Sequence, residues 1–157
     1  MDNKRELLRH SLASVAYRAT RALEGAPDEF ATFSGTGGRQ PVKLLAHMGD
    51  LFDWALSLAK GNEQWHNAKP LAWADEQQRF FATLEAFDAY LASAEPVHAP
   101  LERLFQGPVA DALTHVGQLC MMRRLAGSPT HGENFYVADI SAGNLDATKQ
   151  SAPVQPF

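Results

Sequence analysis

Three polar residues occupy positions in two predicted helices where a core-facing residue would be expected. Asp111 and His115 are four residues apart within residues 108–127, a spacing that places two side chains on the same face of a helix. The apolar residues on that face are Leu119 and Met122. His47, within residues 41–61, belongs to a helical row whose other members are Leu44, Leu51, Trp54 and Leu58. We therefore expect all three polar side chains to point inward.

Two imidazoles and one carboxylate that share a space are a ligand set for a divalent metal ion. Three protein ligands leave a coordination position open, as in catalytic sites. Burying such groups without partners would cost about 1 to 3 kcal/mol for each group. Three structural alternatives remain. His47 could be a hydrogen-bonded core residue, Asp111 could favour a helix N-terminus, and Asp111 could pair with His115 without a metal.

Other metal patterns in the sequence are less suitable. Glu63 with His66 and Glu95 with His98 both match the Glu-x-x-His spacing of di-iron helical proteins. Both pairs fall in segments bounded by proline or glycine, where we expect loops. The predicted core stripes contain no glutamate that could complete a two-metal cage, so a di-iron centre is not expected.

Two further features could suggest chemistry. Gly35, Gly37 and Gly38 precede Arg39 and could hold an anion at the start of the next helix, but the Lys-Ser/Thr of a phosphate loop is missing. We therefore favour a flexible connector. Cys120 lacks a base for a nucleophilic role, because His115 lies about 140° away around the helix.

The hydrophobic periodicity predicts four helices of about 20 residues. They are expected near residues 7–23, 41–61, 72–93 and 108–127, with a short separate piece, LERLF, before the last one. No strand-like alternation is present, so we expect an all-α four-helix bundle with residues 1–140 as its domain. The C-terminal extension should dock through residues such as Phe135 and Ile140, and residues 141–157 should form a flexible tail.

Composition narrows the function classes. The chain has 157 residues, 20% of them charged, and a net charge of −4, and its basic residues form no stripe for a phosphate backbone. We expect no nucleic-acid partner. No run of about 18 apolar residues predicts a membrane span, and the N-terminus lacks the apolar stretch of a secretory signal. One cysteine excludes an internal disulfide and fits a cytoplasmic protein.

The stretches LLAHMGDLFDWAL and LTHVGQLCMMRRLAG resemble the metal-site helices of the DinB-like superfamily, which includes YfiT-type metal-dependent hydrolases and bacterial thiol-dependent transferases. The resemblance covers about residues 5–127. It implies a four-helix bundle in which His47 is the first metal ligand and His115 the third. Asp111 stands where this superfamily usually has histidine, a change that would make the metal a weaker Lewis acid.

The resemblance implies a divalent metal, Zn, Ni, Fe or Mn, that activates a water or a small thiol cosubstrate for reaction with a small molecule. Asp50 and Gln118 are candidates to orient ligands or accept a proton, although Asp50 could instead be exposed helix surface. Trp54 could wall a substrate pocket. The superfamily also implies a homodimer. The alternative is a non-catalytic metal- or small-molecule-binding stress protein with a degenerate site.

Overall fold

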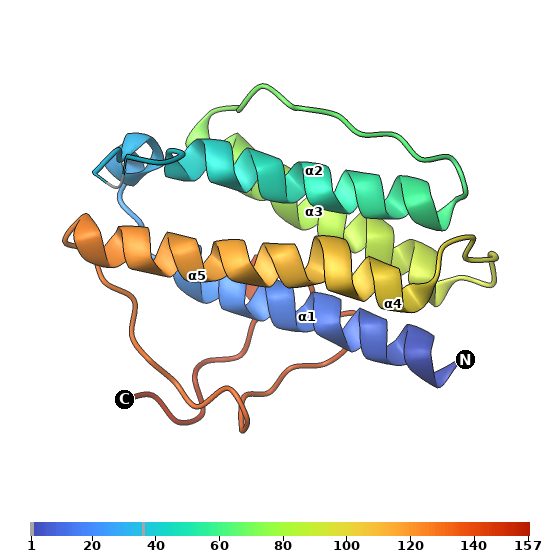
Figure 1. Ribbon diagram of the computed structural model, residues 1–157. Coiled ribbons are helices and arrows are strands. Elements are labelled where there is room, and N and C mark those ends of the chain that lie inside the picture. Colours follow the sequence, from blue (N-terminus) through green and yellow to red (C-terminus); the bar gives the residue numbers. More distant parts are fainter. Residues whose placement is uncertain (1, 36) are drawn as a thin grey trace.

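The computed structural model describes residues 2–35 and 37–157, and these residues form an all-helical fold. Four long helices pack against one another (Figure 1). They are α1 (Asn3–Leu23), α2 (Pro41–Ala59), α3 (Trp73–Ala92) and α5 (Ala110–Leu125). No β-strand occurs in the described ranges, apart from an isolated bridge between Glu133 and Pro156. The all-α prediction is confirmed.

The ends of the long helices follow local chemistry. The side chain of Asp2 accepts a hydrogen bond from the backbone N–H of Lys4 at the start of α1. Pro41 occupies the first position of α2, where its missing N–H costs nothing. Two short 3₁₀ helices are present: η1 (Asp28–Thr32) lies in the connection between α1 and α2, and η3 (Ala147–Lys149) lies in the C-terminal segment.

The last long helix begins earlier than the sequence predicted. The short helix α4 (Leu101–Leu104) continues through a π-helical turn, η2 (Phe105–Val109), directly into α5. The prediction of a separate piece before residue 108 is therefore wrong. Pro108 lies inside the π-turn, and such a widened turn can accommodate a residue that has no N–H to donate.

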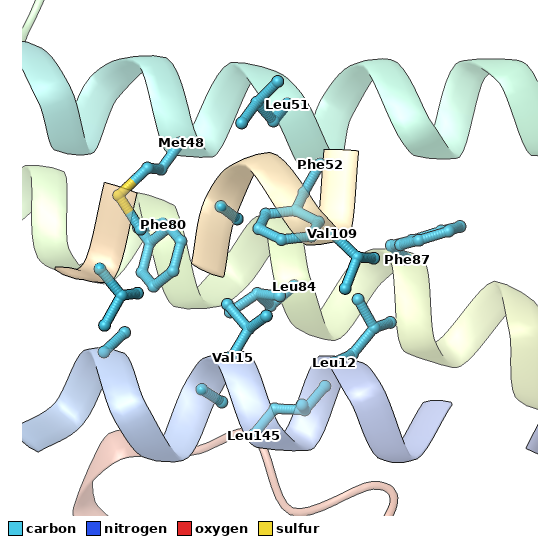
Figure 2. Packing of buried hydrophobic residues seen from close by; sticks show 14 of the residues in the cluster. Leu12, Val15, Met48, Leu51, Phe52, Phe80, Leu84, Phe87, Val109 and Leu145 are labelled. Carbon is cyan, nitrogen blue, oxygen red and sulfur yellow. The ribbon is translucent and has the colours of Figure 1, made fainter. Parts of the chain in front are cut away.

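The core lies between the four long helices, and Figure 2 shows how its side chains meet. Each of the four long helices contributes aliphatic or aromatic residues with almost no exposed surface. Labelled members are Leu12, Val15, Met48, Leu51, Phe52, Phe80, Leu84, Phe87 and Val109. The C-terminal segment lies beside α1 (Figure 1) and adds Leu145, which is buried, to the same core.

The loop between α2 and α3, residues 60–72, runs back along α2 (Figure 1), and we call it the strap. A half-buried arginine of α3 holds it in place. Arg79 Nη2 lies 2.6 Å from Asp50 Oδ1, and Arg79 Nη1 lies 3.1 Å from Glu76 Oε1. The other oxygens of these carboxylates accept hydrogen bonds from the strap's Ala68 and Leu71 backbone N–H groups.

Gly49 of α2 makes this arrangement possible. A Cβ atom there would lie 3.0 Å from Nη1 of Arg79, so a larger residue would displace the guanidinium. No helix in the part of the chain that the structure describes is both long and apolar enough to cross a membrane.

Candidate metal centre

Helices α2 and α5 bring His47, Asp111 and His115 together. Each of the three offers one ligand atom, and these atoms lie within 4.8 Å of one another. His47 Nε2 is 3.8 Å from Asp111 Oδ2, and His115 Nε2 is 3.4 Å from Asp111 Oδ1. The two imidazole rings have centroids 5.0 Å apart. This group could hold a metal ion.

The three residues line a surface cleft, so the expectation of an interior site is wrong. The side chain of Asp111 is 45% exposed, compared with 21% for His47 and 13% for His115. The core row of α5 contains Ala112, Val116 and Leu119. The buried face of α5 is therefore turned part of the way from the predicted one: Leu119 and Met122 are buried as predicted, whereas Asp111 and His115 face the groove beside α2.

Gln118 holds the imidazole ring of His115 by a hydrogen bond to Nδ1. His115 Nδ1 lies 2.8 Å from Oε1 of Gln118, an amide oxygen that accepts a hydrogen bond from the tautomer with its hydrogen on Nδ1. In the neutral form of that tautomer, Nε2 presents a lone pair. It is buried, has no hydrogen-bond partner, and faces Oδ1 of Asp111, which is another acceptor.

Two acceptors that face each other fit a shared cation. Ligand atoms on a tetrahedral ion with bonds of about 2.1 Å are separated by about 3.4 Å. The separation of His115 Nε2 and Asp111 Oδ1 is 3.4 Å, and both atoms belong to residue types that bind zinc or non-haem iron. The residues present therefore fit a divalent metal.

His47 is suited to metal binding by its protonation state. Burial is the largest cause that lowers the pKa of His47, and the positive charge of Arg39 and the neighbouring His115 lower it further. Asp111 and Asp50 act in the opposite direction but do not reverse the shift. The neutral imidazole, which is the form that binds a metal, is therefore favoured at neutral pH.

Trp65, on the strap, brings an aromatic ring next to His47, and this contact was not predicted from the sequence. The ring of Trp65 lies 5.8 Å from that of His47 in an edge-on arrangement. Trp54, the predicted wall residue, contacts Trp65 in the same way, and its Nε1 donates to Oε1 of Glu63 at 3.1 Å. Trp65 belongs to a loop without periodicity, so no sequence signal indicated this contact.

Asp50 has a different environment from the one expected. It is 4% exposed, so the interpretation as exposed helix surface is wrong. Both of its carboxylate oxygens are engaged, one by Arg79 and the other by the backbone of Ala68. Its observed contacts therefore anchor the strap that carries Trp65.

The remaining candidates lie elsewhere. Glu63 and His66 lie on the strap, and Glu95 and His98 lie in the connection after α3, so neither pair is helical. Cys120 lines a separate cavity of about 720 Å³ formed by α1, α5 and the C-terminal segment. It is not among the residues that line the metal cleft.

Comparison with known proteins gives no match: no family model, no curated protein and no solved structure matches this chain. The role of the site must therefore be inferred from its own atoms.

Proposed function

We propose that this protein binds one divalent metal ion, Zn, Ni, Fe or Mn, through His47, Asp111 and His115, and that it acts on a small molecule as a metal-dependent hydrolase or thiol-dependent transferase. One observation carries the proposal. His115 Nε2 is buried, has no hydrogen-bond partner and lies 3.4 Å from a carboxylate oxygen of Asp111. A cation satisfies both atoms at once.

The surrounding residues suit such a role. A divalent ion bound here would act as a Lewis acid and lower the pKa of a neighbouring water or thiol. Gln118 holds the His115 ring and its tautomer, and Trp65 covers one side of His47. The cleft of about 550 Å³ has the size of a small-molecule site.

We also propose that the four packed helices form a DinB-like four-helix bundle. The support is the placement of His47 on the second long helix and of His115 on the fourth, as the sequence resemblance implies. The same resemblance leads us to propose a homodimer. Light scattering coupled to size-exclusion chromatography should then give twice the mass of one chain, and the mass of a single chain would contradict the dimer.

A zinc titration tests the metal site. The full chain should bind one Zn²⁺ in isothermal titration calorimetry, and His115→Ala should weaken binding by at least about a hundredfold, because two ligands remain. His10→Ala is the matched control, since His10 is an exposed histidine on helix α1. It should bind zinc like the wild type. Equal affinities in His115→Ala and wild type would contradict the ligand assignment.

A second candidate function is non-catalytic binding of a metal or small molecule. Apart from the three ligand residues, no carboxylate or histidine lines the cleft in the described part of the chain, so a separate general base is missing there. Assays with esters, phosphates and thiol-plus-electrophile pairs, with and without added metal, separate the two candidates. Metal-stimulated turnover that His47→Ala abolishes supports the enzyme, whereas tight metal binding without turnover supports the binding protein.

A further inference from the structure

We infer that the cleft takes a small molecule with an oxyanion head, a carboxylate or a phosphate, and a short apolar body, and that Arg39 recognises the charge. This inference rests on the proposed metal site and specifies the class of molecule that the site receives.

Arg39 lies next to the candidate metal ligands. It immediately precedes Gln40 and the start of α2, and it lines the same cleft as His47, Asp111 and His115. Its positive charge is one of the causes that lower the pKa of His47, which agrees with this proximity. Among residues 2–35 and 37–157, no carboxylate forms an ion pair with Arg39. Its guanidinium is therefore free to pair with a ligand.

The charge of the cleft favours an anion. Asp111 is the only carboxylate among the described residues that line it. A divalent ion together with Arg39 exceeds that single negative charge, so the occupied cleft is positive overall. The planar guanidinium matches the geometry of a carboxylate or phosphate, and the open coordination position can take one of the oxyanion's oxygens.

Apart from Gly38 and Gln118, the rest of the lining is apolar. Leu44 and Met122 are buried at its base, and the side chain of Met121 is 54% exposed at its rim. Methionine side chains adapt their shape to apolar ligands. A cleft of about 550 Å³ with these walls suits a short alkyl or aryl group rather than a polymer.

Calorimetric titration of the zinc-loaded full chain tests this assignment. Three probes share a six-carbon body: hexanoate and hexyl phosphate carry a charge, whereas hexanamide is neutral. We expect both anions to bind and hexanamide to bind at least about tenfold more weakly. Acetate should also bind about tenfold more weakly than hexanoate, because it is too short to contact the apolar wall.

Arg39→Gln removes the charge, and Arg103→Gln removes an equal charge from an exposed site on α4 that does not line the cleft. We expect Arg39→Gln to weaken the binding of both anions about tenfold while its zinc stoichiometry stays at one. Arg103→Gln should behave like the wild type. Unchanged anion affinity in Arg39→Gln, or equal affinities for hexanoate and hexanamide, would overturn the inference.

The zinc titration separates this outcome from failure of the metal site. A wild-type chain that binds zinc but shows no dependence on Arg39 contradicts only the oxyanion assignment. A chain that binds no zinc contradicts the proposed function, and titration of the metal-free chain with hexanoate then decides whether Arg39 alone recognises the anion.

Discussion

At the scale of single residues, the hydrogen bond between His115 and Gln118 determines which imidazole nitrogen is available. When the neutral ring donates Nδ1–H to Gln118, the lone pair of Nε2 points toward Asp111. Interactions of this kind orient metal-binding histidines and raise their basicity. Gln118 therefore supports the site without itself being one of the three ligands.

Removing this support should weaken metal binding. We expect Gln118→Ala to reduce the affinity for Zn²⁺ about tenfold in calorimetric titration, since the ring and its tautomer are no longer held. Gln118→Glu should retain most of the affinity, because a carboxylate accepts the same hydrogen bond. Gln106→Ala, at an exposed position of η2, is the control. Wild-type affinity in Gln118→Ala would show that the hydrogen bond does not matter.

The protonation of His47 gives a second prediction. The unfolded chain titrates this residue near its ordinary pKa of 6.5, whereas burial and Arg39 lower the pKa in the folded protein. The unfolded state therefore binds more protons between these two values. The contribution of His47 to stability is fully present above pH 6.5 and decreases as the pH falls through the lower, folded value.

NMR titration of the metal-free protein measures this shift. The imidazole resonances of His47 should have a midpoint below 6.5, and Arg39→Gln should move that midpoint upward by removing a nearby positive charge. A midpoint above 6.5 would indicate that Asp111 holds His47 as a protonated partner, as in the metal-free alternative.

Residue types and spacing were sufficient to select His47, Asp111 and His115 from the sequence. They were insufficient to predict the exposure of Asp111, because a small rotation about the helix axis decides whether a residue at the edge of the apolar face is covered. Trp65 and Arg39 lie in non-helical connections, where no periodicity indicates what a side chain will contact. The contacts of Trp65 depend on the path of the strap along α2, which the sequence does not predict.

At the scale of elements, Arg79 joins α2, α3 and the strap. It pairs with Asp50, Asp53 and Glu76 and donates to the carbonyl of Ala46. Asp50 and Glu76 are both buried, and the guanidinium of Arg79 and the strap's N–H groups stabilise the two carboxylates there.

Substitution of Arg79 should destabilise the folded protein. We expect Arg79→Met to lower the free energy of unfolding by about 3 kcal/mol in urea denaturation, because two buried carboxylates lose their cationic partner. Arg103→Met, at an exposed position of α4, should change it by less than about 0.5 kcal/mol. A loss below about 1 kcal/mol in Arg79→Met would mean that water replaces the guanidinium.

Helix prediction worked where apolar periodicity and stop residues agreed, and it was less accurate where tertiary contacts decided. The segments 41–61 and 72–93 correspond to α2 and α3 with shifts of one or two residues. Pro108 suggested a helix boundary, but the helix continues through the π-turn past this residue.

The basic end of α5 fits the helix dipole, as the sequence suggested. Arg123 is nevertheless buried, and it donates hydrogen bonds to the carbonyls of Ala22 and Glu24. These hydrogen bonds join α5 to the end of α1.

At the scale of the whole molecule, the C-terminal segment makes specific contacts with α1. The guanidinium of Arg18 lies 3.9 Å from the ring centroid of Phe135, and Arg21 pairs with the buried Glu133. Leu145, beyond the predicted boundary at residue 140, is 3% exposed. That boundary and the flexible tail remain predictions.

Truncation of the chain tests both the predicted boundary at residue 140 and the predicted flexible tail. A chain that ends at Ile140 should still fold and bind one zinc ion, since its described ligands and long helices are intact. Its free energy of unfolding should fall by about 2 kcal/mol, the contribution of one buried leucine. Leu145→Ala in the full chain should account for most of that loss. Truncation without any loss of stability would show that residues 141–157 are only a flexible tail.

The most direct test of the metal site is an anomalous difference map from a zinc-soaked crystal, measured at the zinc absorption edge. We expect one strong peak, about 2.0 to 2.2 Å from one nitrogen of His47, one nitrogen of His115 and one carboxylate oxygen of Asp111. A peak elsewhere, or no peak while these three side chains keep their positions, would contradict this expectation.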